Sequence, residues 1–190
     1  MSEPATLYLM RHGAPEIEGR LLGRTDCGVT PAGIEACLAQ AATLELSRML
    51  SSDLRRAARC ADAIAAGRTL APDQDRRWRE LDFGDWDGLP ASAIDPDALG
   101  RFWAGPDQAS PPAGERWSDL RARVESAIGD LLPLPTLVVS HGGAIRAALS
   151  VLCGFEQQQC WSFDLPYASL TTIRWWPDLP RRGQITALYP

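Results

Sequence analysis

Residues 6–13 read TLYLMRHG, a short apolar run that ends at Arg11, His12 and Gly13. Residues 136–143 read TLVVSHGG and repeat this pattern, with His141 placed before a pair of glycines. The chain has only these two histidines. A short apolar run that stops at a glycine turn is typical of a buried strand in an α/β sheet. Because ligands bind beyond the carboxyl ends of parallel strands, we expect the two histidines to meet at one edge of the sheet.

Segments on either side of these runs alternate between helix and strand signals. A helix is predicted to begin after an N-cap at Thr30, with Pro31 at its first position. A second helix, ending near Gly67, is predicted to be capped by Ser52 or Asp53. Further strands are predicted at 48–51, 170–175 and 184–189, and further helices at 117–131 and 144–153. The alternation predicts a three-layer α/β/α fold with a mostly parallel central sheet.

The length of 190 residues, with 45% apolar residues, suits a single domain over residues 1–190. Residues 69–116 carry repeated prolines that interrupt any long element. We therefore expect loops and short helices there, lying over the active site at the carboxyl ends of the strands.

The charge balance limits the partners that this chain can bind. Nineteen basic and twenty-four acidic residues give a net charge of −5, which argues against nucleic acid or an anionic membrane as partner. Every basic residue is arginine, so Schiff-base and P-loop lysine chemistry are excluded. Five cysteines without CxxC spacing, and a start unlike a signal peptide, predict a cytoplasmic protein with free thiols.

The neighbours of the histidines narrow the chemistry that they could perform. No HExxH pattern or third ligand favours a metal, and no Gly-x-Ser-x-Gly motif favours a serine hydrolase. Arg11, beside His12, offers a planar fork of donors that matches phosphate oxygens. Glycine after each histidine permits a close backbone approach, so Gly142 is a candidate ligand contact. The alternative is that each histidine and Arg11 are ordinary polar residues at the end of a strand.

Two further segments carry candidate charges. Residues 51–57, SSDLRRA, follow a predicted strand and bring arginines, of which at most one among Arg55, Arg56 and Arg59 is expected to face the crevice. Residues 79–88, RELDFGDWDG, place four carboxylates among aromatic residues and glycines. This segment is either the source of a partly desolvated acid or an acidic surface loop pinned by its aromatic residues.

Five blocks together resemble the histidine phosphatase superfamily, also called phosphoglycerate mutase-like. They are residues 9–13, 23–33, 51–57, 79–88 and 138–143, and the resemblance spans nearly the whole chain. It implies a phosphoglycerate mutase-like α/β fold and a phosphomonoesterase that forms a covalent phosphohistidine. It also implies that no metal or other cofactor is needed, because arginines supply the positive charge.

The resemblance carries roles over to individual residues. It implies that His12 is the nucleophile and that Glu80 is the proton donor. Arg11, Arg56 and His141 match the residues that bind the phosphoryl oxygens, and Gly142 is expected beside them. Residues 82 and 85 are further carboxylates that are candidates to assist the acid.

Two positions depart from the family pattern. The family often has a polar residue after its Arg-His-Gly motif and an asparagine six positions past the histidine, where this chain has Ala14 and Glu18. A carboxylate near a phosphate would repel it, so we expect Glu18 to point away or to pair with Arg20.

Residues 102–103, FW, and 111–117, PPAGERW, resemble the loop that precedes the late helix in α-ribazole phosphatases of cobalamin assembly. We therefore expect a small phosphorylated metabolite as substrate, with α-ribazole 5′-phosphate as the favoured candidate. A phosphoglycerate mutase is the alternative enzyme, and a non-catalytic member that binds a phosphorylated ligand or a partner is the alternative of another class. The pair Trp175 and Trp176 belongs either to the core or to a homodimer interface.

Overall fold

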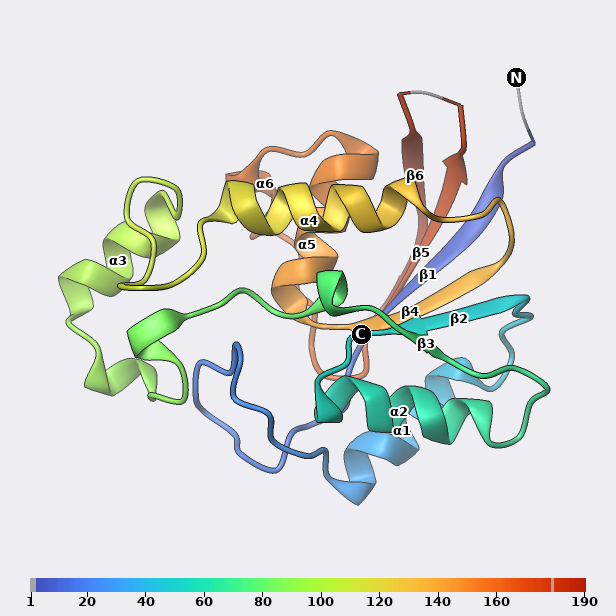
Figure 1. Ribbon diagram of the computed structural model, residues 1–190, viewed down its shortest axis with the longest axis horizontal. Helices are drawn as coiled ribbons and strands as arrows, with labels where there is room; N and C mark the ends of the chain where they lie inside the picture. The colour runs from blue at the N-terminus through green and yellow to red at the C-terminus, as the bar shows by residue number, and fades with distance from the viewer. Residues whose placement is uncertain (1–2, 179) are drawn as a thin grey trace.

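The computed structural model describes residues 3–178 and 180–190, and its centre is one mixed sheet (Figure 1). The strands of this sheet lie in the order β3-β2-β4-β1-β5-β6. Their bounds are β1 Ala5–Arg11, β2 Arg48–Ser51, β3 Asp73–Gln74, β4 Thr136–Ser140, β5 Leu170–Trp176 and β6 Arg182–Tyr189. Strands β3, β2, β4 and β1 run parallel, while β5 pairs antiparallel with both β1 and β6. The predicted α/β fold with a mostly parallel sheet is thus confirmed.

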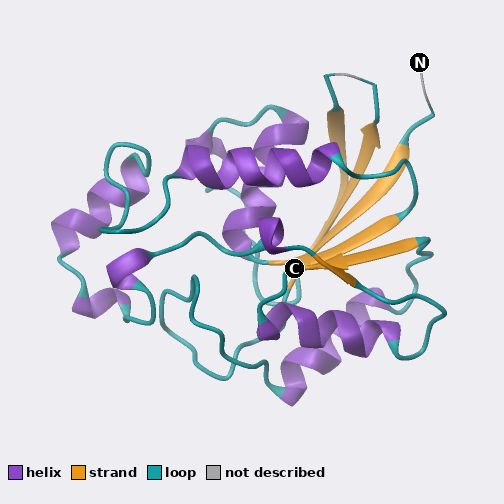
Figure 2. Ribbon diagram, viewed as in Figure 1, coloured by secondary structure: helices purple, strands orange, loops and turns teal. Residues whose placement is uncertain are grey.

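Helices cover both faces of the sheet (Figure 2). One layer holds α1 (Pro31–Ala41) and α2 (Arg55–Ala65), and the other holds α4 (Trp117–Gly129), α5 (Gly142–Cys153) and α6 (Gln157–Cys160). The alternation of side chains along β1 explains the two layers, because Leu7 and Leu9 pack into the core under α4 and α5 while Met10 packs against α1 and α2. None of the helices among the described residues is long and apolar enough to cross a bilayer.

The predicted cap of α1 is confirmed, and the predicted cap of α2 is wrong. The hydroxyl of Thr30 accepts the N–H of Gly33 at 3.0 Å, as an N-cap should. Helix α2 instead begins after Leu54, which has no side-chain cap. The carboxylate of Asp53 is engaged by Arg79 at 2.6 Å, and the N–H of Arg55 donates to a loop carboxylate, that of Asp26, at 2.7 Å. Helix α2 is therefore capped from outside its own segment.

The segment between β3 and α4 extends beyond the carboxyl ends of the parallel strands (Figure 1). It contains short 3-10 turns η1 (Arg76–Trp78), η2 (Gly84–Trp86) and η3 (Ala91–Ala93), followed by the helix α3 (Pro96–Ala104). Phe102 of α3 is fully buried in the core cluster. This burial fixes the segment beside the edge of the sheet where the histidines lie.

Candidate active site

The structure brings His12 and His141 together at the edge of the sheet. Strands β1 and β4 are parallel neighbours with Arg11 level with Ser140, and the N–H of His12 donates to the Ser140 carbonyl at 2.9 Å. Both histidines therefore leave the sheet at the same level, and their ring centroids lie 5.0 Å apart. Both side chains are buried, at 4% and 0% exposure.

The neutral ring of His12 is held in one tautomer. Its Nδ1 lies 2.7 Å from the carbonyl oxygen of Gly13, and because a carbonyl only accepts, Nδ1 carries the proton and donates it. Burial lowers the pKa of His12 well below its ordinary value, and the charges of Arg56 and Arg11 act in the same direction. His12 is therefore neutral near pH 7, with an unshared electron pair on Nε2.

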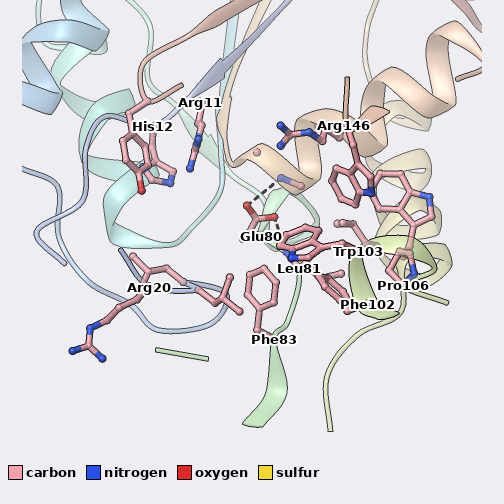
Figure 3. Close-up of a pocket in the computed structure, with 18 residues that line it drawn as sticks. Arg11, His12, Arg20, Glu80, Leu81, Phe83, Phe102, Trp103, Pro106 and Arg146 are labelled. Carbon is pink, nitrogen blue, oxygen red and sulfur yellow. Dashed lines mark hydrogen bonds between the residues drawn. The ribbon is translucent and has the colours of Figure 1, made fainter. Parts of the chain in front are cut away.

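Arg11 lies beside the nucleophile candidate at the end of β1 (Figure 3). Its Nη1 donates to the Leu165 carbonyl at 2.6 Å, and its guanidinium carbon lies 4.1 Å from the centroid of the Tyr167 ring. These contacts fix the plane of the guanidinium. Its Nε is buried and has no hydrogen-bond partner among the described residues.

Arg56 and His141 complete a cradle of donors around His12. Arg56 is fully buried, whereas Arg55 and Arg59 on the same helix are exposed, so one arginine of this group faces inward. The Nε of Arg56 and both ring nitrogens of His141 are buried and lack partners in the described part of the chain. Burial, followed by the charge of Arg56, lowers the pKa of His141. Buried polar groups without a partner are rare, and here they belong to the ring that lies 5.0 Å from that of His12 and to the two arginines whose charges act on His12.

A short loop, residues 22–25, holds Arg56 in place. The Nη1 of Arg56 donates to the Thr25 carbonyl at 2.7 Å, and the Nη2 of Arg56 donates to two further carbonyls of the loop. The loop itself is fixed by the carboxylate of Asp87, which accepts the N–H groups of Gly23, Arg24 and Thr25 at 3.1, 2.5 and 3.0 Å. Two blocks of the sequence resemblance, residues 23–33 and 79–88, therefore meet here to position one guanidinium.

Glu80 lies in the segment that follows η1, and its carboxylate contacts the first turn of α5 near the cradle (Figure 3). Its Oε2 accepts the N–H of Gly143 at 3.1 Å and its Oε1 accepts the N–H of Leu81 at 2.8 Å. A Cβ at position 143 would collide with Oε1, so this contact requires glycine. Burial lowers the pKa of Arg56, and the charge of Glu80 is the largest effect opposing that shift. Glu80 is therefore close to the cradle and oriented by backbone donors.

Other carboxylates singled out in the sequence lie outside the pocket. Asp82 pairs with Arg24 at 3.1 Å and Asp85 is exposed. Glu18 is also exposed, and the guanidinium of Arg20 donates to a backbone carbonyl at 2.7 Å. None of these three carboxylates lines the pocket that contains His12.

The pocket beyond the cradle has a volume of about 380 Å³ and an aromatic far end. Trp161 lies at the centre of this end, with ring centroids 5.5 Å from those of both Trp103 and Trp117. Besides Tyr167, which lies close to His12, the phenylalanine and tryptophan side chains that line the pocket are Phe83, Phe102, Trp103, Trp117 and Trp161. Gly142, the first residue of α5, also lines the pocket, which suits the predicted ligand contact.

Among the charged residues and the tyrosine that line the pocket, sequence reasoning missed Arg146 and Tyr167. Arg146 follows Gly142 by four positions, so one turn of α5 places both on the same face. That spacing was a usable signal. Tyr167 lies in the loop before β5, and no local pattern marks it.

The neutral imidazole, the guanidinium groups and the sheet edge define a phosphoglycerate mutase-like α/β protein. Residues 7–185 match the family described as "Histidine phosphatase superfamily (branch 1)". The chain belongs to this superfamily.

Relatives within the superfamily carry both phosphatase and mutase names. The "Probable phosphoglycerate mutase GpmB" of Salmonella choleraesuis is 31% identical over 160 residues, covering 78% of this chain and 74% of the relative. The mycobacterial glucosyl-3-phosphoglycerate phosphatase is 26% identical with a TM-score of 0.85, over 97% of this chain and 98% of that chain. A structure from Escherichia coli described as "a putative alpha-ribazole-5'-P phosphatase" has a TM-score of 0.85 at 24% identity, over 98% of this chain and 96% of that chain, which shows the shared fold.

Proposed function

We propose that the protein is a phosphomonoesterase that hydrolyses a small phosphorylated metabolite through a covalent phosphohistidine on His12. One observation carries the proposal: the Nδ1 proton of His12 is donated to Gly13, which leaves the Nε2 electron pair free inside a cradle of unpartnered donors. A neutral imidazole so placed is a nucleophile at the pH of the cell, and the guanidinium groups favour a phosphate dianion.

The reaction follows in two displacements. Nε2 of His12 attacks phosphorus, the P–O bond to the alcohol breaks, and the protonated carboxyl of Glu80 gives its proton to the leaving oxygen. Water then attacks the phosphohistidine, the P–N bond breaks, and the Glu80 carboxylate takes the proton of the water. Arg11, Arg56 and His141 bind the phosphoryl oxygens in both steps.

The favoured substrate is α-ribazole 5′-phosphate, an ester of cobalamin assembly. Support comes from the sequence resemblance of residues 111–117 and from the aromatic end of the pocket, where a flat ring system would stack on the tryptophans. Phosphoglycerate mutase activity is the second candidate, which the similarity to the GpmB proteins favours.

Alanine at position 12 tests the proposal. We expect His12→Ala to lower kcat/KM for p-nitrophenyl phosphate at mildly acidic pH by at least about a thousandfold, because the attacking nitrogen is gone. Arg59→Ala, an exposed change on the helix of Arg56, is the control and should retain activity. Undiminished turnover by His12→Ala would reject the phosphohistidine.

A substrate panel separates the candidates. Release of phosphate from α-ribazole 5′-phosphate supports the favoured substrate, and interconversion of 3- and 2-phosphoglycerate supports the mutase. Phosphate binding without turnover of any ester on the panel would support the non-catalytic alternative.

A further inference from the structure

Arg20 and Arg146 both line the pocket without a role in the proposed chemistry, and of the two only Arg146 is partly buried, whereas Arg20 is exposed. Arg146 lies on α5 one turn after Gly142, its Nε donates to the Cys160 carbonyl at 3.2 Å, and its Nη2 donates to the Phe163 carbonyl at 2.8 Å. Its guanidinium carbon lies 5.4 Å from the centroid of the Trp161 ring. These contacts fix the group as a rigid fork.

The remaining nitrogen, Nη1, faces the pocket. It lies 3.0 Å from the position that a Cβ on Gly142, itself a pocket residue, would take, and the guanidinium of Arg11 lies 3.8 Å from the same position. None of the hydrogen bonds among the described residues involves Nη1. Arg146 therefore lies between the phosphate cradle and the tryptophans (Figure 3). Its Nη1 group is available to a bound substrate that extends from the cradle to the tryptophans.

The guanidinium of Arg146 feels the charge of Glu80 but is not in direct contact with a carboxylate of the described residues. No carboxylate forms an ion pair with it in the described residues. Burial lowers its pKa, the charge of Glu80 opposes this, and the charge of Arg11 lowers the pKa further. A partly desolvated cation beside another cation is unfavourable unless a ligand supplies an acceptor.

We infer that Arg146 is a specificity-determining residue, whose Nη1 donates to an acceptor oxygen on the leaving alcohol close to the ester bond. The inference rests on the proposed phosphatase function. The phosphoryl oxygens are bound by Arg11, Arg56 and His141, and the tryptophans can contact only the far part of the alcohol. Between these two ends the substrate must present a hydroxyl or carboxylate oxygen, because an all-carbon linker would leave Nη1 without a partner.

Three esters with the same three-carbon primary skeleton test this inference: propyl phosphate, glycerol 3-phosphate and 3-phosphoglycerate. Arg146→Met keeps the length of the stem and removes the donors. We expect its kcat/KM to fall about tenfold or more for an oxygenated ester relative to propyl phosphate, as for loss of a hydrogen bond to a charged group. A selective fall for both oxygenated esters identifies a hydroxyl acceptor, and a fall for 3-phosphoglycerate alone identifies a carboxylate.

Arg68→Met is the matched control. Its guanidinium also donates to two backbone carbonyls, those of Leu44 and Ala41, but it does not line the pocket of His12. The control should leave the ratios among the three esters unchanged. Because each ratio compares substrates within one variant, a general loss of folded enzyme cancels.

An equal fall for all three esters, or no fall, would overturn the inference. For an ester that is hydrolysed too slowly to give kcat/KM, we compare instead its Ki as an inhibitor of p-nitrophenyl phosphate hydrolysis. If no ester is hydrolysed, Kd values from calorimetry are compared.

The two proposals fail differently. Failure of the phosphatase function shows as turnover independent of His12, whereas failure of this inference leaves that dependence intact and removes only the selectivity.

Discussion

The hydrogen bond from Nδ1 of His12 to the Gly13 carbonyl determines which nitrogen can react. Its geometry leaves Nε2 unprotonated, and burial together with two arginines keeps the ring neutral. Burial also lowers the pKa of His141, for which we propose a role as a donor to a phosphoryl oxygen rather than as a nucleophile. The structural basis of this proposed difference is that only His12 has its Nδ1 engaged by a carbonyl.

The titration of these two imidazoles can be followed directly by NMR. In the phosphate-free protein we expect both midpoints below pH 6.5, because burial and nearby arginines disfavour the charged ring and the neutral form then persists to lower pH. Inorganic phosphate should raise the midpoint of His141, since a dianion favours the imidazolium. The spectrum of His12→Ala assigns the two signals. A midpoint for His12 at or above 6.5 without phosphate would contradict the account.

At this scale, short motifs identified much of the candidate site in advance. His12 and Arg11 lie in one strand-end motif and His141 in another, so local pattern was enough. The choice of Arg56 over its neighbours came only from the resemblance, because helix phase was needed to tell a buried arginine from exposed ones. The spacing of Arg146 from Gly142 hinted at its place, but its orientation depends on the carbonyls of Cys160, at the end of α6, and Phe163, which lie 14 and 17 positions further along the chain.

The element that positions the cradle is the pair formed by loop 22–25 and the segment 79–88. A single carboxylate, Asp87, accepts three backbone N–H groups of the loop, and the loop carbonyls hold Arg56. Asp87 is therefore a positioning residue that acts through the loop. Of the four carboxylates in the acidic segment, Glu80 lines the pocket, Asp87 holds the loop, and Asp82 pairs with Arg24.

Asp87→Ala should release this loop. We expect kcat/KM for p-nitrophenyl phosphate to fall about tenfold or more, and stability to fall by about 1–3 kcal/mol, because three backbone donors lose a charged acceptor. Kinetics at several pH values and thermal unfolding measure the two effects. Asp85→Ala, a change at an exposed carboxylate of the same segment, is the control. Equal behaviour of the two variants would show that Asp87 does not position Arg56.

Element types were predictable from sequence, whereas one cap was not. The strand at residues 48–51 and the closure of α5 by Gly154, with a φ of 75°, follow from local patterns. The cap of α2 was wrongly assigned because Asp53 is engaged by Arg79 and a carboxylate from another loop, Asp26, reaches the first turn. Which carboxylate contacts the start of a helix depends here on tertiary contacts, and the spacing of residues in the sequence does not reveal these.

For the whole molecule, the sheet order assembles the site. Strand β4 inserts between β2 and β1, so the histidine ends of β1 and β4 meet, and the start of α2 lies beside them. Alternation of helices and strands predicted the layers, and the matching motifs predicted that the two histidine-bearing strands are neighbours, but the full strand order depends on non-local pairing and was not predicted. Trp175 is 1% exposed and packs in the core, which accounts for one member of the tryptophan pair within a single chain.

The central claim is a covalent phosphoryl group on His12, and a trapped intermediate tests it most directly. The enzyme is mixed with p-nitrophenyl phosphate, quenched within milliseconds in alkali, where phosphohistidine survives, and digested for mass spectrometry. The account predicts a phosphorylated imidazole on the peptide that contains His12, appearing with the burst of p-nitrophenol and absent from His12→Ala. Phosphate on another residue, or steady hydrolysis with no phosphopeptide at any time, would contradict it.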